Sequence, residues 1–197
     1  MALRICAVFH SDKQDGAAGK PPAVAVNPPM TMAGMEKIDS LVAKIKNDSR
    51  LTELKCGGIY SSRLARALDA ASVFALHFDQ DIRTLEGLGQ MANKEGDEVI
   101  KYPGHEAEDV VIWQVHACSE IQELYQNHFA DYDGRDAEFI VLTGHRPIIG
   151  GLVAWARGVV GDRGALDRLI KDPELVKDGY VVLDYDPDAD GISEVPL

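Results

Sequence analysis

Short apolar runs alternate with stripes of apolar residues at helical spacing, and this alternation leaves the chain few architectures. The runs predicted as buried strands span 3–9, 56–60, 139–143 and 180–185. A helical stripe over 38–45 follows Thr31, and further helices are predicted within 61–76, 106–129 and 145–157. Strands that alternate with helices predict an α/β fold, here a three-layer sandwich: a mostly parallel central sheet with helices on both faces.

Local signals set the ends of several of these elements. Thr31 is predicted to cap the helix that follows it. Residues 13–30 and 79–105 have no period and are predicted to be mostly loop. Residues 186–191 match the opening of a calcium loop, but the twelfth position holds Leu197 in place of glutamate, so a hairpin turn or an acidic tail is the interpretation we adopt.

The composition is that of a soluble globular protein, with 46% hydrophobic and 26% charged residues, and we expect a single domain over 1–197. The net charge of -12 argues against nonspecific binding to nucleic acid, which requires a basic face. Three widely spaced cysteines with no CxxC pair indicate neither a metal site nor a disulfide framework. No apolar run reaches membrane-spanning length, so we expect a cytoplasmic protein with no membrane association.

Polar side chains follow three of the predicted strands, as His10-Ser11, Ser61-Ser62 and Gly144-His145. In sheets of this kind, ligands bind beyond the carboxyl ends of the strands. A neutral imidazole is a good nucleophile toward phosphorus near neutral pH. A second histidine and an arginine could then hold the phosphoryl oxygens. One such histidine is adequately explained by a hydrogen bond at a strand end, whereas two favour a site.

Two arginines, Arg63 and Arg66, lie where the helix after Ser62 is expected to begin. A helix N-terminus favours anions, so an arginine there is opposed by the helix dipole. A purely structural role therefore explains these arginines less well than a role in binding an anion. A solvated surface position remains a plausible interpretation for Arg63, and is less so for Arg66.

Five segments, in order, resemble the signatures of the histidine phosphatase (phosphoglycerate mutase-like) superfamily. His10-Ser11-Asp12 after the first strand resembles its Arg-His-Gly-Glu, and Thr31 to Gly34 resembles its Leu-Thr-x-x-Gly. The remaining matches are 59–70 with Ser-x-x-x-x-Arg-Ala-x-x-Thr-Ala, 85–89 with the loop that bears the family's acid, and 139–145 with Val-x-Ser-His-Gly. The order and spacing of the five segments make the resemblance fairly specific.

The resemblance implies a role for four residues. His10 would be the nucleophile that becomes phosphohistidine, Arg66 and His145 would clamp the phosphoryl group, and Glu86 would protonate the leaving oxygen. Other glutamates close to Glu86 leave its assignment open; they are Glu95, Glu98 and Glu106. The partner would be a small phosphorylated substrate or free phosphate, with no cofactor and no metal.

Three positions depart from the family pattern: Phe9 replaces the arginine before the nucleophile, Ser11 replaces a glycine, and Arg146 replaces the glycine after the second histidine. A lost charge-assisted hydrogen bond costs roughly 1.5–3 kcal/mol. Either Arg146, Arg63 or Lys13 restores the charge, or the site binds a ligand without turnover.

Ser11, Arg63 and Arg146 are the expected substrate-binding residues. The leading hypothesis is a phosphomonoesterase that works through phosphohistidine, and a phosphatase is preferred because the chain is short for a mutase of this superfamily. The alternative is a catalytically impaired relative that binds a phosphorylated ligand or a protein partner.

Overall fold

A six-stranded sheet forms the centre of the molecule, in the order β3-β2-β6-β1-β7-β8. The computed structural model describes residues 2–9, 29–85, 88, 94–95, 98–99, 107–128 and 138–196. The strands of the sheet are β1 (Leu3–Phe9), β2 (Lys55–Ser61), β3 (Ile82–Thr84), β6 (Glu138–Gly144), β7 (Tyr180–Asp186) and β8 (Gly191–Glu194). From β3 to β1 the strands run parallel, and β7 and β8 extend the sheet antiparallel. The predicted mostly parallel sheet is confirmed.

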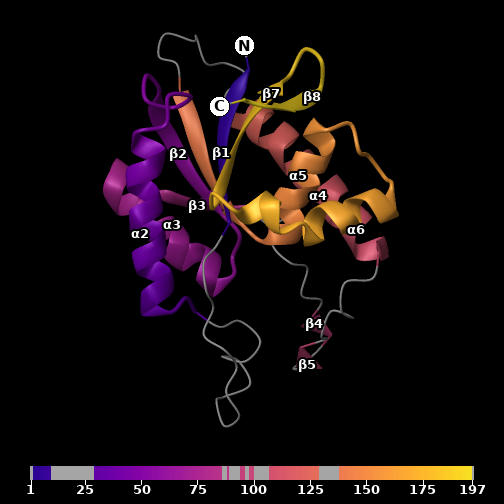
Figure 1. The fold of residues 1–197 in the computed structure, drawn as a ribbon, viewed down its shortest axis with the longest axis horizontal. Coiled ribbons are helices and arrows are strands. Elements are labelled where there is room, and N and C mark those ends of the chain that lie inside the picture. Colours follow the sequence, from indigo (N-terminus) through magenta and orange to yellow (C-terminus); the bar gives the residue numbers. More distant parts are fainter. Residues whose placement is uncertain are drawn as a thin grey trace.

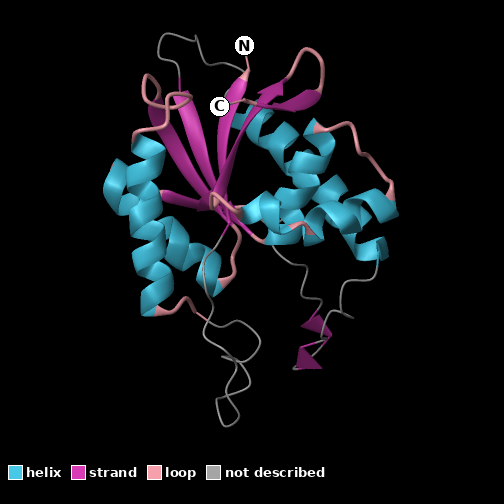
Figure 2. Cartoon of the chain, in the orientation of Figure 1, coloured by secondary structure: helices cyan, strands magenta, loops and turns pink. Residues whose placement is uncertain are grey.

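Helices cover both faces of this sheet (Figures 1 and 2). One face packs against α2 (Met32–Lys46) and α3 (Ala65–Phe78), and the other against α4 (Ala107–His128), α5 (Arg146–Ala156) and α6 (Arg163–Lys171). Each face has its own cluster of buried apolar side chains. The three-layer α/β sandwich expected from the sequence is therefore confirmed.

The first strand shows why its sequence is apolar almost without interruption. Cys6 and Val8 belong to the core on the α2–α3 face, whereas Ile5, Ala7 and Phe9 belong to the core on the α4–α6 face. Successive side chains of a strand point to opposite faces, and here both faces are covered by helices. The predicted buried strand is confirmed residue for residue.

The start of α2 also agrees with its sequence signal. Thr31 is the N-cap residue, and its Oγ1 accepts a hydrogen bond from the Gly34 amide at 3.0 Å. The helix then buries the predicted stripe, which comprises Ile38, Leu41, Val42 and Ile45. A side chain that satisfies one of the free amides of the first turn stabilises a helix start by about 1 kcal/mol.

Several predictions of local structure were wrong or incomplete. The helix expected from Ser61-Ser62 begins only at Ala65, because Ser61 is still part of β2. The strand β3 was expected to be loop, and α6 and the short 3-10 helix η2 (Pro173–Val176) were not expected. A further small pair, β4 (Lys94–Glu95) and β5 (Glu98–Val99), also lies in the segment predicted as mostly loop. The strands and η2 are too short to show a clear period, whereas α6 places Leu166 and Ile170 at helical spacing, a signal that the prediction did not use.

The sequence indicated that the strand over 180–185 is the last one. The structure corrects this, because β8 follows β7 through a tight turn. Asp186 Oδ1 accepts hydrogen bonds from the amides of Asp188 and Ala189, at 3.0 and 3.4 Å. Asp190 then adopts a positive φ of 46°. Side-chain acceptors and a left-handed residue of this kind define a hairpin turn, so the hairpin interpretation of 186–191 is confirmed.

Two absences hold for the described part of the chain. No helix in it has both the length and the apolar character needed to cross a membrane. Nor do three or more histidine, cysteine or acidic side chains gather there in a way that could hold a metal ion.

Candidate active site

The parallel strands bring the predicted site segments to one edge of the sheet. Phe9, the last residue of β1, lies opposite Gly144 of β6, and Ser61 of β2 lies opposite Thr143. His145 directly follows β6, and Ser62 directly follows β2. Residues far apart in the sequence therefore meet at the carboxyl ends of the strands, as the sequence predicted.

His145 is the centre of the described part of this edge. It is the N-cap residue of α5 in an extended conformation, and only 2% of its surface is exposed. Its Nδ1 lies 3.1 Å from Nη2 of Arg66, and its Nε2 lies 3.4 Å from Oγ of Ser62. Both ring nitrogens thus face polar groups of the β2–α3 segment.

The contact with Arg66 determines where the imidazole proton lies. A guanidinium only donates hydrogen bonds, so Nδ1 of His145 must accept. A ring that accepts through Nδ1 is neutral and carries its proton on Nε2. The Nε2–H of His145 is therefore directed at Ser62 Oγ, while Nδ1 on the opposite side of the ring holds Arg66.

Arg66 reaches this position from the first turn of α3 and is half-buried. Burial lowers the pKa of its guanidinium. Arginine nonetheless remains charged in proteins, so Arg66 brings a poorly hydrated positive charge to the edge. A cation of this kind is suited to an oxyanion such as a phosphoryl group.

Hydrogen bonds between β6 and the β2–α3 segment hold the pair in place. Thr143 Oγ1 donates to the carbonyl of Ala67 at 3.1 Å, and the Thr143 carbonyl accepts from the Ser62 amide at 3.3 Å. Thr143 is completely buried, as is Ser62. The sequence placed Ser62 at a strand end but gave it no role. Nothing in the sequence indicated that Thr143 would link β6 to the β2–α3 segment.

The other predicted arginines occupy different surroundings. Arg63 is exposed and precedes the first residue of α3. Arg146 is the first residue of α5, and its Nη2 donates to the backbone carbonyl of Asp172. The roles of both arginines as substrate-binding residues remain predictions.

His10, Ser11, Lys13 and Glu86 lie outside the described residues. The residues immediately before the two proposed reacting groups are described: the Phe9 amide donates to the Gly179 carbonyl at 3.0 Å, and the Leu85 amide donates to the Ser61 carbonyl at 2.9 Å. These two bonds fix the points from which the chain continues to His10 and to Glu86. The roles of the two residues remain predictions.

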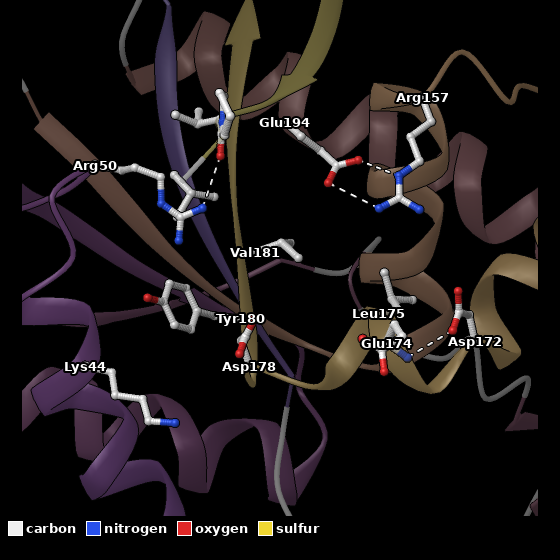
Figure 3. Close-up of a pocket in the computed structure, with 13 residues that line it drawn as sticks. Lys44, Arg50, Arg157, Asp172, Glu174, Leu175, Asp178, Tyr180, Val181 and Glu194 are labelled. Carbon is white, nitrogen blue, oxygen red and sulfur yellow. Dashed lines mark hydrogen bonds and ion pairs between the residues drawn. The ribbon is translucent and has the colours of Figure 1, made fainter.

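A separate groove of about 560 Å³ lies along β7, between the two helical layers (Figure 3). Its lining includes Lys44 and Arg50 on one side and Asp172 and Glu174 on the other. None of the predicted site residues that the structure describes lines it. The arginines in the groove are already engaged, since Arg50 pairs with Asp48 and Arg157 pairs with Glu194, each at 2.5 Å.

The fold of this chain is similar to that of solved phosphoglycerate mutase-like structures. The structure of YhfR from Bacillus stearothermophilus is 17% identical, with a TM-score of 0.65, and the match covers 98% of this chain and 96% of that one.

Two further solved structures agree with this fold. The mycobacterial glucosyl-3-phosphoglycerate phosphatase is 17% identical, with a TM-score of 0.59 and coverage of 98% of this chain and 96% of that one. The phosphoglycerate mutase of Plasmodium falciparum is 18% identical, with a TM-score of 0.57 and coverage of 100% and 90%. No family model matches the sequence, and no curated protein matches it either. At these identities the likeness establishes the fold.

Proposed function

We propose that this chain is a phosphomonoesterase that acts on a small phosphorylated substrate through a phosphohistidine intermediate on His10. The observation that carries the proposal is the contact between Arg66 and His145, whose atoms Nη2 and Nδ1 are 3.1 Å apart at the edge where β1 ends. His10 is the next residue after β1. The named phosphatase and mutase among the similar structures support the same class of chemistry.

The proposed reaction has two steps. An imidazole nitrogen of His10 attacks the phosphorus, the bond from phosphorus to the ester oxygen breaks, and Glu86 supplies the proton that the leaving alcohol needs. Water then attacks the phosphohistidine, Glu86 takes a proton from it, and inorganic phosphate leaves. Arg66 and His145 would hold the phosphoryl group, and the charge of Arg66 would stabilise the negative charge on its oxygens in both steps.

A second candidate function is supported by Phe9. Its side chain is only 7% exposed and packs in the core on the α4–α6 face, so it brings no charge to the position before His10. A phosphoryl site with one cation fewer could bind a phosphorylated ligand and turn it over very slowly. A catalytically impaired binding protein is the alternative.

Hydrolysis of an aryl phosphate between pH 5 and 8 tests the proposal, with His10→Ala as the control. We expect turnover that depends on His10, together with an acid-labile phosphoryl adduct on the wild-type chain in intact-mass measurements. Absence of His10-dependent turnover would refute the enzyme proposal. Binding of phosphate or vanadate that is lost in Arg66→Ala, without turnover, would then support the binding protein.

A further inference from the structure

The groove along β7 has no part in the proposed reaction, although it is large enough for a ligand (Figure 3). Its volume of about 560 Å³ falls within the range of small-molecule sites, roughly 300–1,000 Å³. Its lining comes from α2 and the loop after it, from the end of α5, from η2 and from β7 with the segment after β8. An inference about the groove is therefore independent of the strand-end site.

Aliphatic side chains form the part of the lining that lies between the charged residues. Val181 separates the α2 side from the η2 side in Figure 3. The other aliphatic lining residues are Leu175, Val182, Val195 and Pro196. A ligand with an apolar body would remove this surface from water, which favours binding.

Ion pairs and hydrogen bonds hold the walls of the groove in place. Arg50 pairs with Asp48 and donates through Nη1 to the carbonyl of Val195 at 3.1 Å. On the other side, Arg157 forms two hydrogen bonds with Glu194. These arginines are engaged within the protein, and the walls that they fix would lose little freedom when a ligand binds.

Two charged lining residues, Lys44 and Asp178, take no part in these contacts. Among the described residues, neither the ammonium of Lys44 nor the carboxylate of Asp178 has a hydrogen-bond or ion-pair partner. Both side chains are exposed, and they do not pair with each other. Lys44 extends from α2, whereas Asp178 lies just before β7 (Figure 3). The groove thus offers a ligand one cation and one anion.

A ligand with a single kind of charge fits this lining less well. An anion that pairs with Lys44 would enter a groove that also contains the carboxylates of Asp172, Glu174 and Asp178. An amine that pairs with Asp178 would leave Lys44 without a partner and add a like charge to the groove. Like charges in one site weaken binding, whereas a ligand that carries both charges meets a complementary group at each end.

We propose that the groove along β7 binds a small zwitterion with an aliphatic body, whose carboxylate pairs with Lys44 and whose ammonium pairs with Asp178. Free aliphatic amino acids and short apolar peptides share this chemistry. The site is separate from the phosphoryl site and does not depend on whether the chain is a phosphatase.

Calorimetric titration of the full chain with zwitterions of different length tests the proposal. The probes are 4-aminobutanoate, 6-aminohexanoate, 8-aminooctanoate, leucine and trialanine. Each is compared with two relatives of the same carbon skeleton, one that lacks the ammonium charge and one that lacks the carboxylate charge. We expect at least one zwitterion to bind about fivefold more tightly than both of its relatives, because it forms two charge-assisted contacts instead of one. The relative affinities of leucine and trialanine distinguish an amino acid from a peptide as the ligand.

Substitutions of the two charged residues assign the ends of the ligand. In Lys44→Gln the zwitterion should bind no better than its amine relative, and in Asp178→Asn no better than its carboxylate relative. Lys44→Glu should reverse the preference, so that a diamine such as 1,6-diaminohexane binds more tightly than 6-aminohexanoate. Both positions are exposed, so these variants should fold, and thermal unfolding checks this.

The matched controls change the same residue types outside the groove. Lys46→Gln removes a lysine of the same helix that donates to the carbonyl of His77, and Asp188→Asn removes an exposed carboxylate of the β7–β8 turn. Neither control should alter the preference for the zwitterion.

Three results would overturn the inference: no zwitterion preferred to its relatives, a preference that survives both Lys44→Gln and Asp178→Asn, or an equal loss in the controls. None of these measurements requires turnover. The aryl phosphate assay with His10→Ala therefore decides the proposed function separately.

Discussion

Two half-buried arginines, Arg50 and Arg66, have opposite electrostatic surroundings. The pKa of Arg50 is raised, chiefly by its hydrogen bonds to Asp48, whose carboxylate also accepts from the hydroxyl of Tyr180 at 2.6 Å. The pKa of Arg66 is lowered by burial, and its described contact is the imidazole of His145. The first cluster pairs its arginine with a carboxylate, whereas the second places its arginine beside an imidazole at the edge of the sheet.

The two arginines illustrate two roles of a charged side chain: Arg50 stabilises the fold through an ion pair, and Arg66 is available to a site. A buried ion pair that is fully hydrogen-bonded gains nothing from a ligand, and loss of either partner leaves an uncompensated charge. A buried cation beside a neutral donor is costly in the empty protein and is stabilised by an anion. Arg50 should therefore matter for stability and Arg66 for activity.

Arg66→Ala should have the largest effect. We expect kcat/KM for an aryl phosphate to fall about 10²-fold to 10³-fold, since a preorganised charge at the phosphoryl oxygens is lost. The free energy of unfolding, measured by urea denaturation, should change by less than about 1 kcal/mol because a buried cation is removed with its interactions. Arg66→Lys should restore only part of the activity. Loss of stability with unchanged kcat/KM would reverse the comparison.

Arg50→Ala should show the opposite pattern. The side chains of Arg50 and Asp48 are 13% and 4% exposed, so the variant leaves a buried carboxylate without its main partner. We expect the free energy of unfolding to fall by about 3 kcal/mol, with kcat within about twofold of wild type in the folded protein. The matched control is Arg157→Ala, whose ion pair with Glu194 is largely exposed and should contribute less than about 1 kcal/mol.

Asp48→Asn tests the same cluster through pH. The hydrogen bond from Arg50 is the main cause that holds the pKa of Asp48 well below its usual value. A carboxyl group with a lowered pKa in the folded state contributes stability above its unfolded pKa, about 3.9, and this contribution is lost as the pH falls further. The wild-type chain should be more stable than the variant by about 2 kcal/mol at neutral pH.

That difference should be constant above about pH 5 and should shrink below about pH 4. Urea denaturation of both chains at a series of pH values measures it. A difference that is independent of pH down to pH 2 would show that the charge of Asp48 is not what stabilises the cluster.

Ser62→Ala should have the smallest effect. The distance of 3.4 Å between Ser62 Oγ and Nε2 of His145 is that of a weak hydrogen bond. We expect kcat/KM to fall by about twofold to tenfold through looser orientation of the imidazole, and stability to change little. A loss as large as that of Arg66→Ala would mean that Ser62 itself contacts the phosphoryl group.

The sequence predicted those parts of the fold whose buried residues follow a regular pattern. The strand over 3–9, the capped helix after Thr31 and the strand around 139–143 are all confirmed. The elements that it missed are short or lie at an edge: only Leu166 and Ile170 are buried in α6, and β3 has three residues. A strand of three residues is too short to define a period, so pairing with its neighbour decides β3, whereas the helical spacing of Leu166 and Ile170 was a signal that the prediction did not use.

For the site, the sequence alone identified residue types at strand ends, namely His145 and the helix arginine Arg66. It determined that they follow a strand and open a helix, because local periodicity and end signals are encoded in adjacent residues. Only the tertiary structure brought the two to 3.1 Å across 79 positions of sequence. It also decided that Arg146 binds the Asp172 carbonyl, since a backbone acceptor is the same at every residue and leaves no mark in the sequence.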